Sequence, residues 1–331
     1  MPRPTRLVLV SGHAFGAAAF AGILSSDAFL EDQLEVSAVI GLRAEQASKT
    51  VGYRSLAPLA AEHQLRYLDA PDGRLRGVAG LIRGIRPHYL LVIGWSSIVC
   101  PEVLAIPAEA AEMKRDGLPD GVGCIGMHPT KLPEGRGQAP IPWTIIKGLK
   151  NTALSVFFLE EAADTGPVVA QYPVEVSPRE TASSLFYKME HAHFRAGAEL
   201  AGGLAGRTVT GSKQDESAAS LWPRRRPEDG ELTAAMTCDE IDRQVRALLG
   251  PYPRAFVTCE SSRIPVRGVV PLGSPLSDRQ LAQDADESVL PFRCADGVAG
   301  LIPDRTHTLG PVRTRPTGSE KQGGELRGAA G

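Results

Sequence analysis

A short apolar run that ends at a His-Pro pair constrains this chain more than any other stretch. Val122 to Met127 is apolar throughout, which is typical of a buried strand in a parallel sheet, and Pro129 has no backbone donor to continue the ladder. We therefore expect His128 at the carboxyl end of a strand. Ligands bind at that edge of an open α/β sheet, because the loops that leave it diverge and form a crevice.

A second apolar run, Ala153 to Leu159, is followed by Asp164. If the two strands are neighbours, Asp164 leaves the sheet near the same edge and its carboxylate meets the His128 imidazole. Such a carboxylate orients the ring and stabilises its protonated form. A histidine and an aspartate in two loops are more often structural or solvated, so spacing alone leaves both interpretations open.

The residues around this pair resemble a known signature. The segments are HPTKLP (128–133), RGQAP (136–140), WTIIKG (143–148) and DTG (164–166). Their order is similar to that in the folate-dependent formyltransferases, which move a formyl group from N10-formyltetrahydrofolate to an amine. The family includes amino-sugar and other small-molecule N-formyltransferases and is related to methionyl-tRNA formyltransferase. The resemblance implies catalysis at His128 and Asp164, with N10-formyltetrahydrofolate as the cosubstrate.

One position departs from the family pattern. The family usually has an asparagine two residues before the histidine, and Gly126 stands there in this chain. Residues two apart on a strand share a face, so the missing amide would have pointed toward the same site as His128. We expect the glycine to make room for the acceptor or for a different acyl donor, rather than only to lack a hydrogen-bond donor.

The resemblance also implies binding residues. In this family the loop after the strand at 89–94 helps to wall the pterin pocket, which makes that loop and two alanines the candidates for binding the cofactor: Trp95, Ser96, Ser97, Ile98, Val99, Ala162 and Ala163. Trp95 is equally compatible with a place in the core. The candidate substrate contacts are Thr130, Arg136 and Gln138.

The chain predicts two domains with different architectures. A strand at 6–11, a glycine turn and an alanine-rich helix predict an α/β fold, with a doubly wound, Rossmann-like, mostly parallel sheet over residues 1–205. The turn reads G-x-x-x-G and lacks the dinucleotide fingerprint, so we do not expect NAD binding. Residues 206–221 are rich in Gly, Ser, Thr and charge and predict a linker. Residues 222–305 predict a small C-terminal β-rich, OB-like domain, and 306–331 a disordered tail.

Two capping boxes predict where helices begin in these domains. Ser177 to Glu180 predicts a helix that starts at Pro178 and packs an apolar stripe on the sheet. His191 and His193 on that helix cannot face one ligand together, and we expect both to be solvated or partly packed. Thr237 to Glu240 predicts a second helix that ends before Gly250.

Composition limits the partners and the compartment. A net charge of −2 gives no long-range attraction to nucleic acid or to an anionic membrane. The five cysteines are scattered and form no C-x-x-C pair, which predicts a reduced, cytoplasmic protein without a metal site such as a structural zinc. The sequence shows neither a signal peptide nor a stretch of eighteen apolar residues, so we expect neither export nor a membrane span.

These observations favour an N-formyltransferase that acts on a primary amine of a small metabolite, such as an amino sugar or an amino-acid derivative. Its expected partners are the folate donor and the amine, with a homodimer possible. Methionyl-tRNA formyltransferase is an alternative, but it is expected to carry a basic loop where residues 43–54 hold three basic side chains. A formyltetrahydrofolate hydrolase carries the same His and Asp, but is expected to have an N-terminal regulatory domain before the strand at 6–11. A non-catalytic folate-binding protein is suggested only by Gly126.

Overall fold

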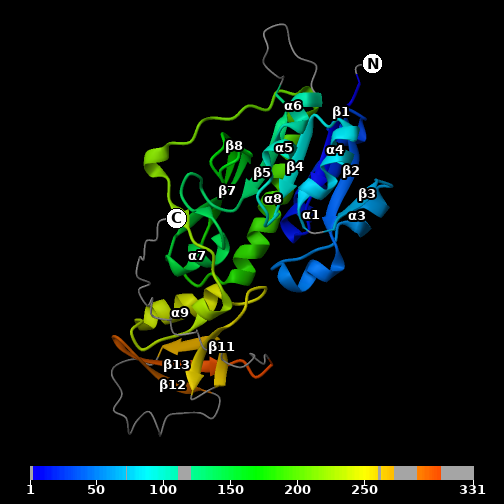
Figure 1. Cartoon of the computed structure of the whole chain (residues 1–331). Helices are drawn as coiled ribbons and strands as arrows, with labels where there is room; N and C mark the ends of the chain where they lie inside the picture. The colour runs from blue at the N-terminus through cyan, green and yellow to red at the C-terminus, as the bar shows by residue number, and fades with distance from the viewer. Residues whose placement is uncertain (1–2, 72, 111–120, 260–261, 272–288, 307–331) are drawn as a thin grey trace, which may run out of the picture.

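The chain forms a larger α/β unit and a smaller β-rich unit, and helix α9 (Cys238–Ala247) lies between the two sheets (Figure 1). The computed structural model describes residues 3–71, 73–110, 121–259, 262–271 and 289–306. The larger unit contains a seven-stranded sheet and the smaller a four-stranded one. This arrangement confirms the predicted fold class.

The large sheet has the strand order β3-β2-β1-β4-β5-β7-β8. Its strands are β1 (Thr5–Val10), β2 (Leu34–Leu42), β3 (Tyr67–Ala70), β4 (Tyr89–Ile93), β5 (Gly123–His128), β7 (Asn151–Phe158) and β8 (Val168–Glu175). The five strands from β1 to β5 pair in parallel, whereas β7 and β8 pair antiparallel to their neighbours. The sheet is therefore mostly parallel, with an antiparallel edge next to His128.

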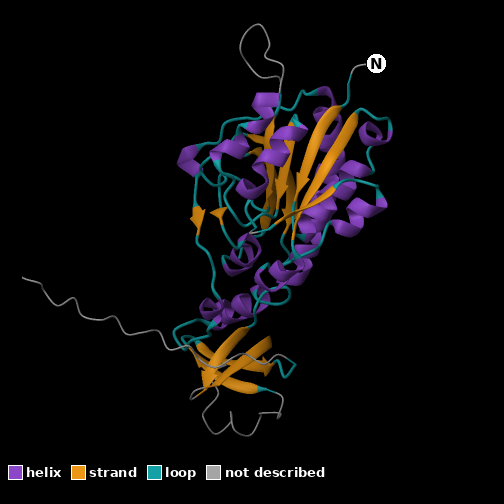
Figure 2. Ribbon diagram, turned by 45° about the vertical axis from the view of Figure 1, so that its right-hand side comes forward, coloured by secondary structure: helices purple, strands orange, loops and turns teal. Residues whose placement is uncertain are grey.

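Helices cover both faces of this sheet, as Figure 2 shows. One core cluster contains residues of α1 (Ala14–Leu24) and α8 (Ala182–Gly206), and a second contains residues of α4 (Ala79–Ile85), α5 (Pro101–Leu104) and α6 (Ile106–Ala110). A Cβ atom on Gly22 would collide with the carbonyl oxygen of Phe194, and one on Gly197 with that of Ala19. Glycine at these two positions lets α1 and α8 pack backbone to backbone.

Shorter elements complete the larger unit. They are α2 (Asp27–Leu30), η1 (Ala44–Lys49), α3 (Ala57–Glu62), η2 (Leu75–Val78), β6 (Arg136–Gly137), α7 (Pro140–Ile146), η3 (Glu216–Ala218) and β9 (Leu221–Trp222). β6 pairs in parallel with β9, so the end of the predicted linker lies beside the loop that follows His128. Ser212 likewise forms a bridge with Val168 at the start of β8. The segment predicted as a linker therefore runs along the larger unit.

One helix start was predicted incorrectly. α8 begins at Ala182 and is capped by Thr181, whose side chain accepts a hydrogen bond from the Ser184 backbone. The Glu180 carboxylate does accept from the Ser177 backbone N–H at 2.9 Å, but the helix does not start at that box. The exposure expected for the two histidines of α8 holds only for His191, because His193 is fully buried.

The smaller unit is built on an antiparallel sheet of order β10-β11-β13-β12. Its elements are η4 (Pro227–Gly230), α9, β10 (Ala255–Cys259), β11 (Ser262–Pro271), β12 (Leu290–Cys294) and β13 (Gly297–Pro303). The predicted capping box is confirmed at the start of α9, where Thr237 and Glu240 cap each other's backbone. Apolar residues of α9 and of the sheet form one core. The exact domain boundaries stay a prediction, and the tail after Thr306 lies outside the described residues.

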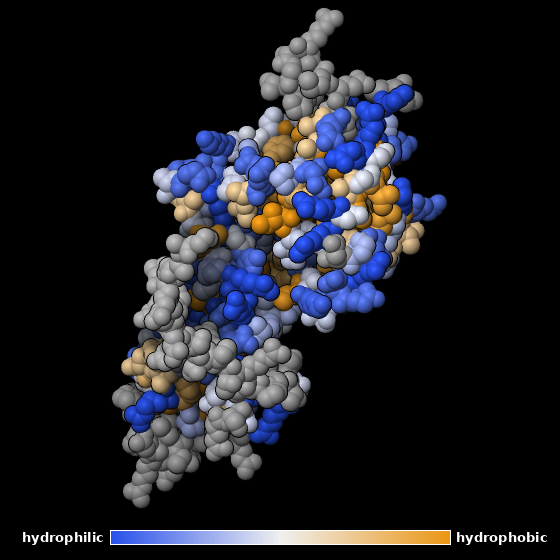
Figure 3. Space-filling view, in the orientation of Figure 1, coloured by the Kyte–Doolittle hydropathy of each residue, from blue (hydrophilic) through white to orange (hydrophobic). Residues whose placement is uncertain are grey.

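The space-filling view shows apolar residues in several separate groups on the larger unit, among hydrophilic ones (Figure 3). Among the residues that the structure describes, the most exposed large apolar side chains are Leu221, Ile98, Leu30 and Tyr187. Within the described residues, no helix combines the length and the apolar character that crossing a bilayer requires.

Candidate active site

His128 is the last residue of β5, and only 7% of it is exposed. Its Nε2 lies 2.9 Å from the carbonyl oxygen of Gly135. Because a carbonyl oxygen only accepts, this contact places a proton on Nε2 and leaves Nδ1 facing Asp164. Nδ1 lies 3.7 Å from Asp164 Oδ2, which is an ion-pair distance and longer than a hydrogen bond. The structure thus brings the two predicted catalytic residues together.

Asp164 reaches His128 by a different route from the one expected. β5 and β7 are neighbours, but they are antiparallel, with His128 opposite Ser155 and Ile125 opposite Phe158. The end of β7 therefore points away from the edge at which His128 lies. The turn between β7 and β8 folds back, and Asp164 sits in it with a left-handed backbone, φ 59°. Its Oδ2 accepts a hydrogen bond from the Gly137 backbone N–H at 2.8 Å.

A glutamine from the predicted linker holds the Asp164 turn in place. The Gln214 side chain donates to the carbonyl oxygens of Asp164 and Gly166, at 2.9 and 2.7 Å. Its own oxygen accepts from the Arg136 guanidinium at 2.8 and 3.1 Å. Gln214 is buried, so these bonds are shielded from water. The polar composition of residues 206–221 gave no signal for this role, because the contact depends on how distant segments meet.

The guanidinium of Arg136 is occupied by protein partners. Besides Gln214 it binds the Glu216 carboxylate through two hydrogen bonds of 2.7 and 2.9 Å. The hydrogen bond to Glu216 raises the pKa of Arg136 above its ordinary value and lowers that of Glu216. Arg136 was predicted as a substrate contact, but in this structure its charge fixes the loop after β5 to the segment around η3.

The other two predicted substrate residues differ in exposure. Thr130 is 1% exposed, and its hydroxyl oxygen is buried without a hydrogen-bond partner, although its carbonyl accepts from Ser155 at 2.7 Å. Gln138 is exposed, and its backbone N–H donates to the Trp222 carbonyl at 3.1 Å. Of the three candidates, Gln138 is thus the one whose side chain faces solvent.

The loop predicted to wall the cofactor pocket follows β4, the strand beside β5. Val99 is buried and Trp95 is half-buried against the core cluster that contains Cys124, so the alternative core role of Trp95 is partly met. Ile98 is 73% exposed and Ser96 is also exposed, whereas Ser97 is intermediate. The predicted pair Ala162 and Ala163 is exposed in the turn that carries Asp164.

Two family models match this chain. The formyl transferase model matches residues 57–197, which include both His128 and Asp164, and the model of the formyl transferase C-terminal domain matches residues 225–302. The chain belongs to the formyltransferase family.

Several solved structures have a fold similar to that of this formyltransferase. One is WlaRD, a sugar 3N-formyl transferase in the presence of dTDP and 5-N-formyl-THF, with 13% identity, a TM-score of 0.63 and coverage of 92% of this chain and 99% of that one. An N-formyltransferase from Helicobacter canadensis, in complex with folinic acid and dTDP-3-aminofucose, is 16% identical, with a TM-score of 0.63 and coverage of 91% and 99%. Methionyl-tRNA formyltransferase from Clostridium thermocellum is 18% identical, with a TM-score of 0.54 and coverage of 82% and 95%.

Gly126, where this formyltransferase departs from the expected asparagine, does not border open space. A Cβ atom added there would lie 2.6 Å from Leu159 Cδ2 and 3.3 Å from Phe157 Cε1. The structure therefore contradicts our expectation that the glycine makes room for a ligand. The room is taken by Leu159, which is partly buried against the same cluster as Cys124.

The sequence analysis missed a cluster of aromatic rings in this formyltransferase. It is formed by His13 and Phe15, which follow β1, and by His193 of α8. The Phe15 ring stacks on the His193 ring, with 4.4 Å between the ring centroids, and its centroid lies 4.5 Å from that of His13. Burial lowers the pKa of His13 to about 4 and that of His193 to about 3, so both rings are neutral near pH 7. Gly94, at the start of the loop after β4, lies against His13. The sequence signal that could have pointed to this cluster is the position of His13 just after the first predicted strand.

Proposed function

We propose that this chain is an N-formyltransferase that moves the formyl group of N10-formyltetrahydrofolate to the primary amine of a small metabolite, such as an amino sugar or an amino-acid derivative. The contact between buried His128 and Asp164, at the carboxyl end of β5, carries this proposal. A histidine and a carboxylate that share one contact can hold and move a proton, which is what acyl transfer to an amine requires.

The proposed reaction forms one bond and breaks one. The amine nitrogen bonds to the formyl carbon, the bond between that carbon and N10 of the folate breaks, and one proton passes from the amine to N10. His128 stabilises the negative charge on the formyl oxygen or takes the amine proton, and Asp164 orients His128 and balances its charge. The bond from Gly137 N–H to Asp164 Oδ2 keeps the carboxylate aimed at the imidazole.

The exposed apolar surface of the loop at 95–99 supports the proposal of a folate donor. Ile98 offers an apolar side chain to solvent in the loop that follows β4, and β4 pairs with β5, the strand that ends at His128. Apolar side chains with a few polar groups among them are typical of ligand pockets. The buried, unpartnered hydroxyl of Thr130 adds a polar atom two residues after His128. We assign Trp95 to Val99, Ala162 and Ala163 to the donor and Gln138 to the acceptor.

A small acceptor is favoured over tRNA by the segment at 43–54. Two of its three basic side chains have carboxylate neighbours, since Arg43 lies 3.9 Å from Asp69 and Arg54 lies 4.0 Å from Glu190. These charges are partly balanced within the chain, so they offer less attraction to phosphates than an unpaired basic loop would.

The test supplies the purified chain with N10-formyltetrahydrofolate and, in separate reactions, nucleotide-linked amino sugars, amino acids, initiator methionyl-tRNA or no acceptor. We expect a formylated small amine, detected by mass spectrometry, together with an equal amount of tetrahydrofolate. Asp164→Asn should abolish product, whereas Asp215→Asn, a change at an exposed aspartate, should not. Formate released without an acceptor would identify a hydrolase, and formylation of tRNA alone would replace the small-molecule assignment.

A further inference from the structure

Two cysteines and an aspartate meet where α9 touches the small sheet. Cys238 is the first residue of α9, Cys294 ends β12, and Asp296 lies in the turn between β12 and β13. One ligand atom from each of the three residues lies within 4.8 Å of the others. The two thiols are not joined by a disulfide.

The backbone around this cluster is already fixed. Asp296 Oδ1 accepts a hydrogen bond from the Cys238 backbone N–H at 2.7 Å. The Ala295 N–H donates to the Met236 carbonyl at 2.8 Å, which ties the hairpin turn to the residues just before the helix. Cys294 pairs with Gly297 in the hairpin register. The three side chains are therefore brought together by the local fold, as a preformed metal site requires.

The Asp296 carboxylate supplies the negative charge of the cluster. Burial, followed by hydrogen bonds to Cys294 and Asp296, raises the pKa of the Cys238 thiol to about 12, so this thiol keeps its proton until a metal ion displaces it. The hydrogen bond from the Cys238 N–H lowers the pKa of Asp296, so this carboxylate stays charged beside two thiols. A bound divalent cation would balance the charge of this carboxylate and of the thiolates that form on binding.

We propose that Cys238, Cys294 and Asp296 bind one Zn²⁺ ion. Thiolate sulfur and carboxylate oxygen are both zinc ligands, and two thiolates favour zinc over the harder ions Mg²⁺ and Ca²⁺. Three protein ligands leave the fourth tetrahedral position to water, and Asp296 is exposed, so water can reach the ion. Binding converts the two thiols to thiolates and releases their two protons to the buffer.

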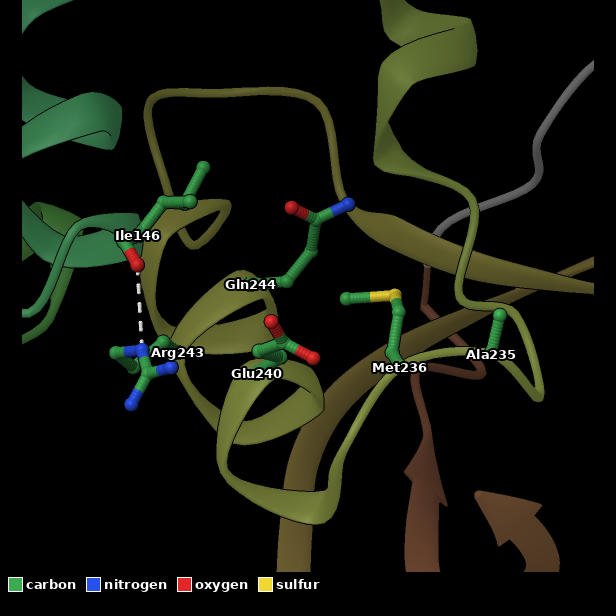
Figure 4. A pocket seen from close by; sticks show the side chains of 6 residues that line it. All are labelled: Ile146, Ala235, Met236, Glu240, Arg243 and Gln244. Atoms are coloured by element: carbon green, nitrogen blue, oxygen red, sulfur yellow. Dashed lines mark hydrogen bonds between the residues drawn. The ribbon is translucent and has the colours of Figure 1, made fainter. Parts of the chain in front are cut away.

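The site would join the start of α9 to the β12–β13 hairpin. Further along the same helix, Arg243 Nε donates to the Ile146 carbonyl at the end of α7, at 3.2 Å, beside the cavity lined by Met236 and Glu240 (Figure 4). α9 thus contacts the larger unit through one part and the metal site through another. We infer that Zn²⁺ stabilises the attachment of the small sheet, and that it takes no part in formyl transfer.

The experiment titrates the full, reduced chain with Co²⁺ and then displaces it with Zn²⁺ against a chromophoric chelator. We expect one ion per chain, a thiolate-to-cobalt absorption band in the near ultraviolet, a melting temperature raised by zinc, and close to two protons released. Cys238→Ser should remove the band. Asp296→Asn keeps an acceptor for the Cys238 N–H but should weaken affinity at least about tenfold, since losing even a hydrogen-bonding partner of a metal ligand costs about 10- to 100-fold.

Cys259→Ser is the matched control, because Cys259 is an exposed cysteine of the same sheet and should bind metal like the unchanged chain. All variants are compared by circular dichroism, so that a misfolded Cys238→Ser protein is not mistaken for a lost site; the exposed position of Asp296 makes its variant the decisive one. No cobalt band in the unchanged, reduced chain would overturn the proposal. A band that survives in both site variants would overturn it as well. So would a count of only three free thiols among the five cysteines after reduction, if the two missing thiols were Cys238 and Cys294 joined in a disulfide.

Discussion

Two loops beside the candidate active site are built in opposite ways. The loop at 129–139, after β5, is held by distant segments: the Leu132 N–H donates to Ser155 Oγ at 3.1 Å, and the Gly135 N–H to Ser220 Oγ at 2.9 Å. The loop at 94–99, after β4, presents Ile98 and Ser96 to solvent and is anchored by Val99 and by half-buried Trp95. One loop is fixed by hydrogen bonds to distant segments, and the other carries exposed side chains that we propose contact the folate donor.

This difference separates catalysis from binding. A proton-transfer pair must be positioned closely, because misplacing reacting groups by about 1 Å can cost about 10²-fold in rate. A surface for a large ligand gains from exposed apolar side chains that become covered on binding. Changes in the held loop should therefore act on kcat, and changes in the exposed loop should act on KM.

The largest effect is expected at His128. His128→Asn should lower kcat by about 10² to 10⁴, because the variant retains a polar side chain but loses the group that moves a proton. The melting temperature should fall only slightly, since one hydrogen bond to Gly135 is affected. Steady-state kinetics and thermal unfolding measured on the same preparation test this. A loss of activity that merely follows a loss of folded protein would remove His128 from the catalytic role.

The next largest effect should come from Gln214. Gln214→Leu leaves Asp164 O, Gly166 O and Arg136 short of a buried partner, and each such loss costs about 1 to 3 kcal/mol, so we expect a total of at least about 3 kcal/mol. kcat should fall with little change in the KM of the donor, because the Asp164 turn loses its support. Urea unfolding and kinetics together measure both effects.

Glu216→Gln provides the matched control on the same arginine. The Glu216 side chain is 62% exposed, so its ion pair with Arg136 should be worth at most about 1 kcal/mol. If Glu216→Gln slowed the reaction as much as Gln214→Leu, the Arg136 charge rather than the Asp164 turn would be the important feature.

The sequence predicted correctly the ends of elements that depend on a few neighbouring residues. The proline after His128 ends β5, and the reciprocal bonds of Thr237 and Glu240 begin α9, so both positions followed from a few neighbouring residues. The direction of β7 did not follow, because the segment that contains α7 resembles a crossover between parallel strands. The register of β5 against β7, which runs from Ile125 opposite Phe158 to His128 opposite Ser155, shows that the strands are antiparallel.

Long-range contacts account for what the sequence could not predict. Gln214 lies in a polar stretch that is indistinguishable from a linker until it meets Arg136. Cys238 and Cys294 have no common motif, and the C-x-D spacing at 294–296 was the only local sign of their cluster. Leu159, which fills the space beside Gly126, follows the end of β7, so this contact depends on the sheet register.

The third effect concerns Gly126 and its neighbour. Gly126→Asn should destabilise the chain by about 1 to 3 kcal/mol through overpacking, because the new side chain meets Leu159. Leu159→Ala in the same chain should relieve the clash, so the two changes together should cost less than the sum of the single changes. A double-mutant cycle of unfolding free energies measures this coupling.

Turnover in the same variants then tests the amide. If the asparagine of the double variant reaches the site, kcat should rise, since one oriented donor at a developing oxyanion is worth roughly 2.7 to 4 kcal/mol in comparable sites. Additive stability changes would show that Leu159 does not limit this position, and an unchanged kcat would show that the chain has replaced the missing donor elsewhere.

The smallest effect is expected in the exposed loop, at Ile98. Because its side chain is 73% exposed, Ile98→Ala should change the unfolding free energy by no more than about 0.5 kcal/mol. The KM of N10-formyltetrahydrofolate should nevertheless rise by up to about tenfold, since each CH₂ group that a ligand covers contributes about 0.8 kcal/mol. Leu30→Ala, at an exposed apolar residue of α2, is the control and should leave KM unchanged. A fall in kcat with an unaltered KM would mean that this loop also positions the reacting groups, and the separation between the two loops would then not hold.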